Sequence, residues 1–342
     1  MRISTQQLAA QLERKLALLY TVFGAEPLLA LEAADRIRAA ARKQAYAERE
    51  VLTAETGFNW SSLSFSANSF SLFATKRILE LRIPSGKPGV EGAETIVGFC
   101  NRLPDDSICL VVLPDLDRTQ QNSKWFATLE AAGVAVEAKE VSLQQLPGWL
   151  GERLALQKQQ CDKETLQWLT ERVEGNLLAA YQEVQKLALL FPEGKLDGEA
   201  VREAVLDVSR YDVWKLGEAV LARDIPRLMR MMEGLQGEGT APPLVLWAIT
   251  EEIRALLKVS EGLQAGRQAA QLMRDARVWG ARQNLMEKAA RNADPAQMKI
   301  ALARAAQTDK LIKGLRRGDV WDELLQLALL TAGKPALKQV TV

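Results

Sequence analysis

The first part of the chain alternates between short continuous apolar runs and segments in which apolar residues recur every three or four positions. Continuous apolar runs are typical of parallel strands covered on both faces, whereas the wider spacing predicts amphipathic helices. Because helical segments separate the runs, we expect a doubly wound α/β domain with a parallel sheet over residues 1–140. The runs that predict strands lie at 17–24, 49–53, 76–83, 108–113 and 133–138.

Helices are predicted between these strands. One is expected over residues 5–19, where leucines recur at helical spacing, and another begins at Pro27. A polar loop is expected through Trp60 and the Ser-rich stretch that follows, because serine side chains compete with the helical backbone for hydrogen bonds. No strand is predicted after Lys139.

The chain beyond that point predicts two helical domains. A small one is expected over residues 141–211, with a hinge candidate at 207–212, and a second one, of five or six helices, over residues 212–342. In the small domain, Pro147 lies at the start of one helix, and residues 163–173 and 177–191 form two more. Asp197 caps a further short helix. In the second domain, breaks at 237–243 and 294–295 separate the helices.

One predicted helix, at residues 244–259, is apolar nearly all round its first two turns, which include Leu246, Trp247 and Ile249. A helix of that kind is expected to be buried. The pattern leaves two alternatives open, burial within its own bundle and burial against a neighbouring subunit.

Composition places the chain among ordinary globular proteins. Its 342 residues favour two or three domains, and hydrophobic and charged fractions of 48% and 25% are typical of folded chains. A net charge of +1 argues against a protein that binds polyanions over its whole surface, although local basic patches remain possible. We find no apolar run long enough to span a bilayer and no apolar signal-peptide core in residues 1–7, and therefore expect a cytoplasmic protein.

The chain has no histidine and three cysteines. Without histidine it lacks the commonest general base, the usual partner of a Ser or Cys nucleophile, and the commonest metal ligand. The cysteines Cys100, Cys109 and Cys161 form no Cys-x-x-Cys pair, so we interpret them as small buried apolar residues. We expect no catalytic site and no metal site.

A turn after the first long strand occupies the place of a phosphate-binding loop. Such a loop needs several glycines, a lysine and a hydroxyl residue. The turn at residues 23–29 has a single glycine, Gly24, and carries an acid, Glu26. Pro27 also removes one N–H donor. We therefore predict that this turn binds no nucleotide.

Large apolar residues interrupt a run of small polar ones at residues 66–77. They are Phe70, Leu72 and Phe73, and the basic pair Lys76 and Arg77 follows. Ser and Asn are poor helix formers, so the stretch predicts a loop or a frayed helix end. Either these apolar residues fold back onto their own core, or they enter a pocket on a partner.

Basic residues surround a tryptophan in the last third of the chain. Arg274, Arg277 and Arg282 lie close to Trp279, an arrangement that can hold a phosphate and stack a base. The alternative is a buried tryptophan flanked by solvated arginines. Arg316, which precedes Arg317 and Gly318, is either a further phosphate contact or a cap of a helix C-terminus.

The chain also contains six short motifs that carry a family resemblance through their order along the sequence. They lie at residues 24–29, 71–74, 174–179, 187–196, 277–279 and 319–321. In this order, and over essentially the whole chain, the sequence resembles the delta subunits of the bacterial DNA polymerase III clamp loader.

The resemblance implies an AAA+-like α/β domain, a helical lid domain and a helical collar that assembles into a pentameric ring. Partners would be the sliding clamp (the beta subunit), the tau/gamma ATPase subunits, delta-prime and primed DNA. A delta subunit binds and opens the clamp without hydrolysing ATP, and its clamp-binding pair falls on Leu72 and Phe73, with Phe70 beside them. The chain would belong to a DNA-directed DNA polymerase holoenzyme by membership, with no cofactor and no catalytic site of its own.

Three other functions compete with this one. An active ATPase of the same architecture is disfavoured by the turn at Gly24. The loader's other non-hydrolysing subunit is expected to carry a cysteine zinc module and a Ser-Arg-Cys finger, and this sequence has neither. A helical scaffold of an AAA+ assembly, without direct clamp contact, remains open.

Overall fold

The computed structural model describes residues 1–68, 76–205, 209, 211–280 and 282–334. The chain divides into two compact units, Met1–Thr170 with Leu177–Ala204, and Glu171–Asn176 with Val205–Val342. The three-domain division at residues 140 and 211 stays a prediction.

A six-stranded sheet organises the first unit, with all its strands parallel. Its order is β1-β6-β2-β5-β4-β3, and every residue of β2 is buried. The parallel sheet predicted from the apolar runs is therefore confirmed. The strands are β1 (Arg2–Ser4), β2 (Leu19–Phe23), β3 (Glu48–Thr53), β4 (Arg77–Arg82), β5 (Ser107–Val112) and β6 (Val134–Glu137).

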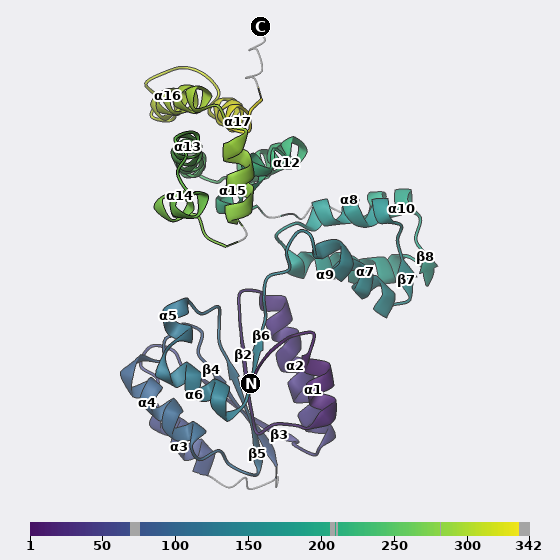
Figure 1. The fold of residues 1–342 in the computed structure, drawn as a ribbon. Helices are drawn as coiled ribbons and strands as arrows, with labels where there is room; N and C mark the ends of the chain where they lie inside the picture. Colours follow the sequence, from purple (N-terminus) through teal and green to yellow (C-terminus); the bar gives the residue numbers. More distant parts are fainter. Residues whose placement is uncertain (69–75, 206–208, 210, 281, 335–342) are drawn as a thin grey trace. The chain divides into compact units, whose positions relative to one another are not determined.

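Helices cover both faces of this sheet (Figure 1). On one face, Leu8 and Ile37 pack against Tyr20 and Val22. On the other, Leu63, Ile96 and Phe126 pack against strand residues such as Leu79. The first face carries α1 (Leu8–Arg14) and α2 (Pro27–Lys43), and the second carries α3 (Ser61–Asn68), α4 (Gly89–Cys100), α5 (Arg118–Gln121) and α6 (Lys124–Ala132).

A helical group follows the sheet within the first unit. Asp197 accepts a hydrogen bond from the N–H of Ala200 at 3.0 Å, which confirms it as a helix cap. The elements are α7 (Leu146–Leu156), β7 (Gln159–Gln160), α8 (Lys163–Val173), α9 (Leu177–Leu190), β8 (Gly194–Lys195) and α10 (Gly198–Ala204).

The second unit is a helical bundle around α13. The described part shows seven α-helices and a 3-10 turn there, where five or six helices were expected. No helix among the described residues is long and apolar enough to cross a membrane. The elements are η1 (Val213–Lys215), α11 (Leu216–Ala222), α12 (Ile225–Gly237), α13 (Pro242–Gln264), α14 (Ala269–Asp275), α15 (Arg282–Arg291), α16 (Pro295–Ile312) and α17 (Val320–Thr331).

Helix α13 buries only part of its apolar surface within this bundle. Leu246 and Ile249 lie in the core, whereas Trp247 is 50% exposed. Its ring packs edge-on against that of Trp214, which is also 50% exposed, with 4.8 Å between the centroids. Burial within the bundle therefore accounts for Leu246 and Ile249 but not for Trp247, and burial of Trp247 against a neighbouring subunit stays a prediction.

Three further sequence predictions differ from the structure, and two elements were not predicted. The first helix spans only Leu8–Arg14, because Leu19 belongs to β2 instead. Residues 61–68 form helix α3 rather than a loop, since the buried Leu63 anchors it to the core. Strand β1 and helix α4 were not predicted. The short strands β7 and β8 do follow Lys139, and the Gln159 side chain, which donates to the carbonyls of Leu187 and Phe191, fixes them.

Candidate functional site

The turn after β2 is closely packed by the chain itself. Gly24 has φ of +137°, and a Cβ at this position would lie 2.2 Å from the carbonyl oxygen of Ala138. The N–H of Gly24 donates to Pro114 O at 3.3 Å, and the N–H of Glu26 donates to Ala138 O at 3.1 Å. Two backbone donors that a phosphate would need are thus already used.

The N-terminus of α2 is also occupied, by a side chain of the protein itself. Its carboxylate cap is Glu26, which accepts a hydrogen bond from Leu28 N at 3.2 Å. Pro27, the first residue of the helix, has no N–H to offer. A helix N-terminus attracts anions through free N–H groups and its dipole, and here a carboxylate of the chain takes that place.

The predicted apolar tip, Phe70, Leu72 and Phe73, lies outside the described residues. Helix α3 leads to it, with Leu63 buried in the core and Phe65 76% exposed. Strand β4 begins just beyond it. The structure therefore describes both ends of the tip segment.

Trp279 stands on a tightly held turn between α14 and α15. Its side chain is 62% exposed, so the alternative of a buried tryptophan is wrong. The preceding Val278 is buried, and its N–H donates to Met273 O at 2.9 Å. Arg277 and Gly280 both have positive φ, +56° and +64°, which turns the chain sharply on either side. The indole thus projects from an anchored loop.

Arg282 is engaged with the protein rather than free. Its Nη2 donates to Oε2 of Glu252, a buried carboxylate on α13. Burial raises the pKa of Glu252, although the adjacent Arg282 favours its charged form. Gly217 leaves the room for this pair, since a Cβ there would collide with the Glu252 carboxylate. Arg282 is thus tied to α13 through this pair.

The other predicted basic contacts are more accessible. Arg274 is exposed and donates to Gln271 Oε1 at 2.6 Å within α14. Arg316 is exposed and donates to Gln307 Oε1 on α16 at 3.4 Å. Arg274 and Arg277 share the neighbourhood of Trp279 along the chain. DNA contact by these two, by Arg282 and by Arg316 stays a prediction.

A buried ion network in the sheet was not predicted. Glu80, in β4, is fully buried and accepts hydrogen bonds from Arg38 at 2.9 and 3.0 Å. Arg49 and Arg82 also donate to it, at 3.0 and 2.7 Å. Burial by itself would raise the pKa of Glu80, but the three guanidinium groups lower it to about 2. In the sequence, the only indication of this network was Glu80 itself, a single acid among the apolar residues of β4.

Cys100 and Cys109 are buried, as predicted, whereas Cys161 is only half-buried. Burial raises the pKa of Cys100 and of Cys109 to about 12 and that of Cys161 to about 11, so all three thiols are protonated at neutral pH. The described ranges contain no cluster of three or more Cys, Asp or Glu side chains that could hold a metal ion.

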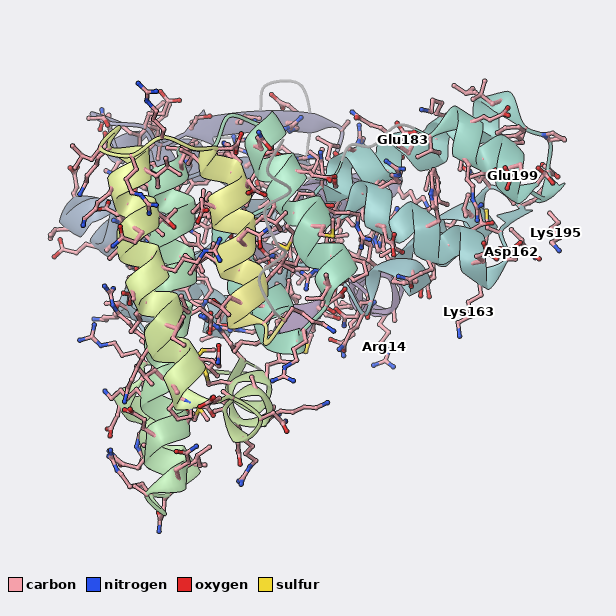
Figure 2. The ribbon with its side chains drawn as sticks, turned by 90° about the horizontal axis from the view of Figure 1, so that it is seen from above. Arg14, Asp162, Lys163, Glu183, Lys195 and Glu199 are labelled. Carbon is pink, nitrogen blue, oxygen red and sulfur yellow. The ribbon has the colours of Figure 1, made fainter. Side chains whose placement is uncertain are left out.

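Charged side chains at the start of α8 and α10 point outward (Figure 2). Asp162 caps α8 by accepting from Thr165 N at 2.8 Å, and that hydrogen bond lowers its pKa. Lys163, Lys195 and Glu199 lie nearby. Because acids and lysines are mixed here, this end of the helices is not a basic patch for nucleic acid.

Comparison with known proteins relates the chain to one family. Residues 20–139 match the family described as "DNA polymerase III, delta subunit", and residues 210–330 match "DNA polymerase III delta subunit, C-terminal domain". The chain is 30% identical to DNA polymerase III subunit delta of Escherichia coli K12, over 98% of this chain and 97% of that one. It is 28% identical to the same subunit of Haemophilus influenzae, over 77% of each.

A solved structure has a similar fold. The Bacillus subtilis DNA clamp loader delta protein (YqeN) superimposes with a TM-score of 0.53, covering 96% of this chain and all of that one, at 17% identity. The expected α/β domain with a parallel sheet, followed by helical regions, is confirmed. The chain is thus of the clamp-loader subunit class. Within that class, it belongs to the DNA polymerase III delta subunit family.

Proposed function

We propose that this delta subunit binds the sliding clamp through Leu72 and Phe73, with Phe70 beside them, and favours an open form of the clamp. The observation that carries the proposal is the 30% identity to the Escherichia coli subunit over 98% of the chain. The apolar tip fits this role by its composition, since two large apolar side chains interrupt a polar stretch.

Burial of the tip would supply part of the binding free energy. Burying a Leu or Phe side chain contributes about 1.5–3 kcal/mol, so the pair contributes about 3–6 kcal/mol. A nanomolar complex needs about 12 kcal/mol, and further contacts from the same domain supply the remainder. Opening requires only that these contacts fit the open clamp better than the closed one.

The subunit acts within a larger assembly. The helical domain over residues 212–342 is the collar that joins tau/gamma ATPase subunits and delta-prime in a pentameric ring, which works in the cytoplasm at the replisome. The occupied N–H groups at Gly24 and Glu26 support a subunit that leaves ATP hydrolysis to its partners. Trp279, with Arg274 and Arg277, contacts primed DNA in the assembled loader.

Clamp binding by the wild type and by a Leu72→Ala/Phe73→Ala variant tests the central claim. We expect the wild type to bind and the folded variant, checked by circular dichroism, to lose most of its affinity. Equal binding by the two proteins would remove the tip from the mechanism. If neither protein binds, the helical scaffold without clamp contact becomes the better account.

A further inference from the structure

The two ends of the segment that carries the apolar tip are tied to each other. Ser66 lies in the last turn of α3, and Arg77 is the first residue of β4. The Arg77 guanidinium donates through Nη2 to the backbone carbonyl of Ser66. Both residues are buried. The chain therefore leaves and re-enters the described structure through one hydrogen-bonded stem, formed by Ser66, Arg77 and Glu50.

Glu50, in β3, joins both sides of this stem. Its Oε1 accepts from the Ser66 hydroxyl at 2.5 Å, and its Oε2 accepts from Arg77 Nη1 at 3.3 Å. One carboxylate thus holds the helix end and the strand start together. The remaining Nε of Arg77 donates to the Ser107 hydroxyl of β5 at 3.2 Å, which ties the stem to the next strand as well.

The chemistry of Arg77 suits this role. A planar guanidinium presents several donors in fixed directions, so it can bond a carbonyl, a carboxylate and a hydroxyl at once. A lysine at this position would keep the charge but could not hold three partners in this geometry. Because Arg77 is buried, its contacts are shielded from competing water.

Closing the ends of a segment has a consequence for binding. A loop with free ends loses conformational entropy when a partner immobilises it, whereas a loop held at its base has already lost part of it. The ten residues between Ser66 and Arg77 span the three that the tip contributes to clamp binding. The stem therefore lowers the entropic cost of docking the tip.

We propose that Arg77, Glu50 and Ser66 are positioning residues for clamp binding: they fix the two ends of the segment that carries Leu72 and Phe73, without touching the clamp themselves. This inference rests on the proposed function of the tip. It adds three residues from β3, α3 and β4 that the sequence pattern did not single out as a site.

The test measures clamp affinity of Glu50→Gln, Ser66→Ala and Arg77→Lys. Each variant weakens a charge-assisted or buried hydrogen bond of the stem, so we expect affinity to fall about 5-fold or more while the far-ultraviolet circular dichroism stays that of the wild type. Arg82→Lys is the matched control, because Arg82 lies on the same strand and pairs with Glu80 instead. It should bind as the wild type.

A double-mutant cycle with Phe73→Ala separates positioning from general stability. If the stem acts through the tip, Glu50→Gln has a smaller effect on clamp affinity in the Phe73→Ala background than in the wild type. An equal effect in both backgrounds, or full affinity of all three stem variants, would overturn the inference and leave the tip proposal standing. Wild-type affinity of Phe73→Ala and of Leu72→Ala/Phe73→Ala would overturn both.

Discussion

Glu174 and Arg227 form a buried ion pair in the second unit. Oε1 of Glu174 lies 2.7 Å from Nη2 of Arg227 and 2.9 Å from its Nε. Glu174 lies in the turn between α8 and α9, and Arg227 is on α12. The pair ties residues 171–176, which include the end of α8, to α12 within the second unit.

Removing Glu174 should destabilise the C-terminal bundle. Glu174→Ala leaves the buried Arg227 charge uncompensated, and we expect the free energy of unfolding to fall by about 3 kcal/mol. The matched control is Glu171→Ala, which removes a neighbouring ion pair with Arg230 at 3.3 Å whose side chains are about one third exposed. That loss should be below about 1 kcal/mol. Urea unfolding followed by circular dichroism gives both values, and equal losses would contradict this account.

Glu80 should make stability fall in acid. Its folded pKa of about 2 lies below the ordinary 4.5, so its contribution is fully present above pH 4.5 and is lost as the pH falls towards 2. The size is about 3 kcal/mol. We expect Glu80→Gln to show a correspondingly smaller drop in unfolding free energy between pH 5 and pH 2 than the wild type. Asp35→Asn, at the exposed partner of Arg38, is the control and should follow the wild type closely.

Gly24→Ala should destabilise the α/β unit. The position has φ of +137°, and the new Cβ would meet the Ala138 carbonyl at 2.2 Å, so backbone must shift. We expect a loss of more than about 2 kcal/mol. Gly57→Ala is the control, because Gly57 also has positive φ (+82°) but has open space around it. It should cost about 1 kcal/mol. The melting temperatures of the two variants test this expectation. Similar values would show that the contact between a Cβ at position 24 and the Ala138 carbonyl is unimportant.

Trp279→Ala should weaken DNA binding by the assembled loader while leaving clamp binding intact. Stacking of a base on an aromatic side chain contributes about 1–3 kcal/mol, so DNA affinity should fall about 5- to 100-fold. Fluorescence anisotropy of a labelled primer-template, with the complete loader and clamp, measures it. Ile300→Ala, at another exposed apolar side chain of the second unit, controls for general surface effects. Unchanged DNA affinity would remove Trp279 from the interface.

Sequence pattern predicted the central strands well, because their continuous apolar runs reflect burial on both faces. The pattern did not predict strand β1, since three residues are too few to show a pattern and pairing with β6 defines this strand. It did not predict helix α3 either, because burial of Leu63 overrides the weak helix preference of the serines in this helix.

For the candidate sites, the residue types in a segment were more informative than the place of that segment in the chain. The lack of lysine and further glycines in the Gly24 turn was visible, but its hydrogen bonds to Pro114 and Ala138 were not, because these partners lie far along the chain. The same holds for Glu80, whose partner Arg38 is 42 residues away. Such pairings are created by the fold rather than by local sequence.

The parallel sheet also separates the Gly24 turn from the stem at Arg77. The Gly24 turn follows the carboxyl end of β2, whereas Arg77 opens the amino end of β4, so the two lie at opposite edges. Strands of this length hold those edges about 15–20 Å apart, too far for one side chain to bridge. Substitutions at the two ends share no contact, so their effects on the free energy of unfolding should add.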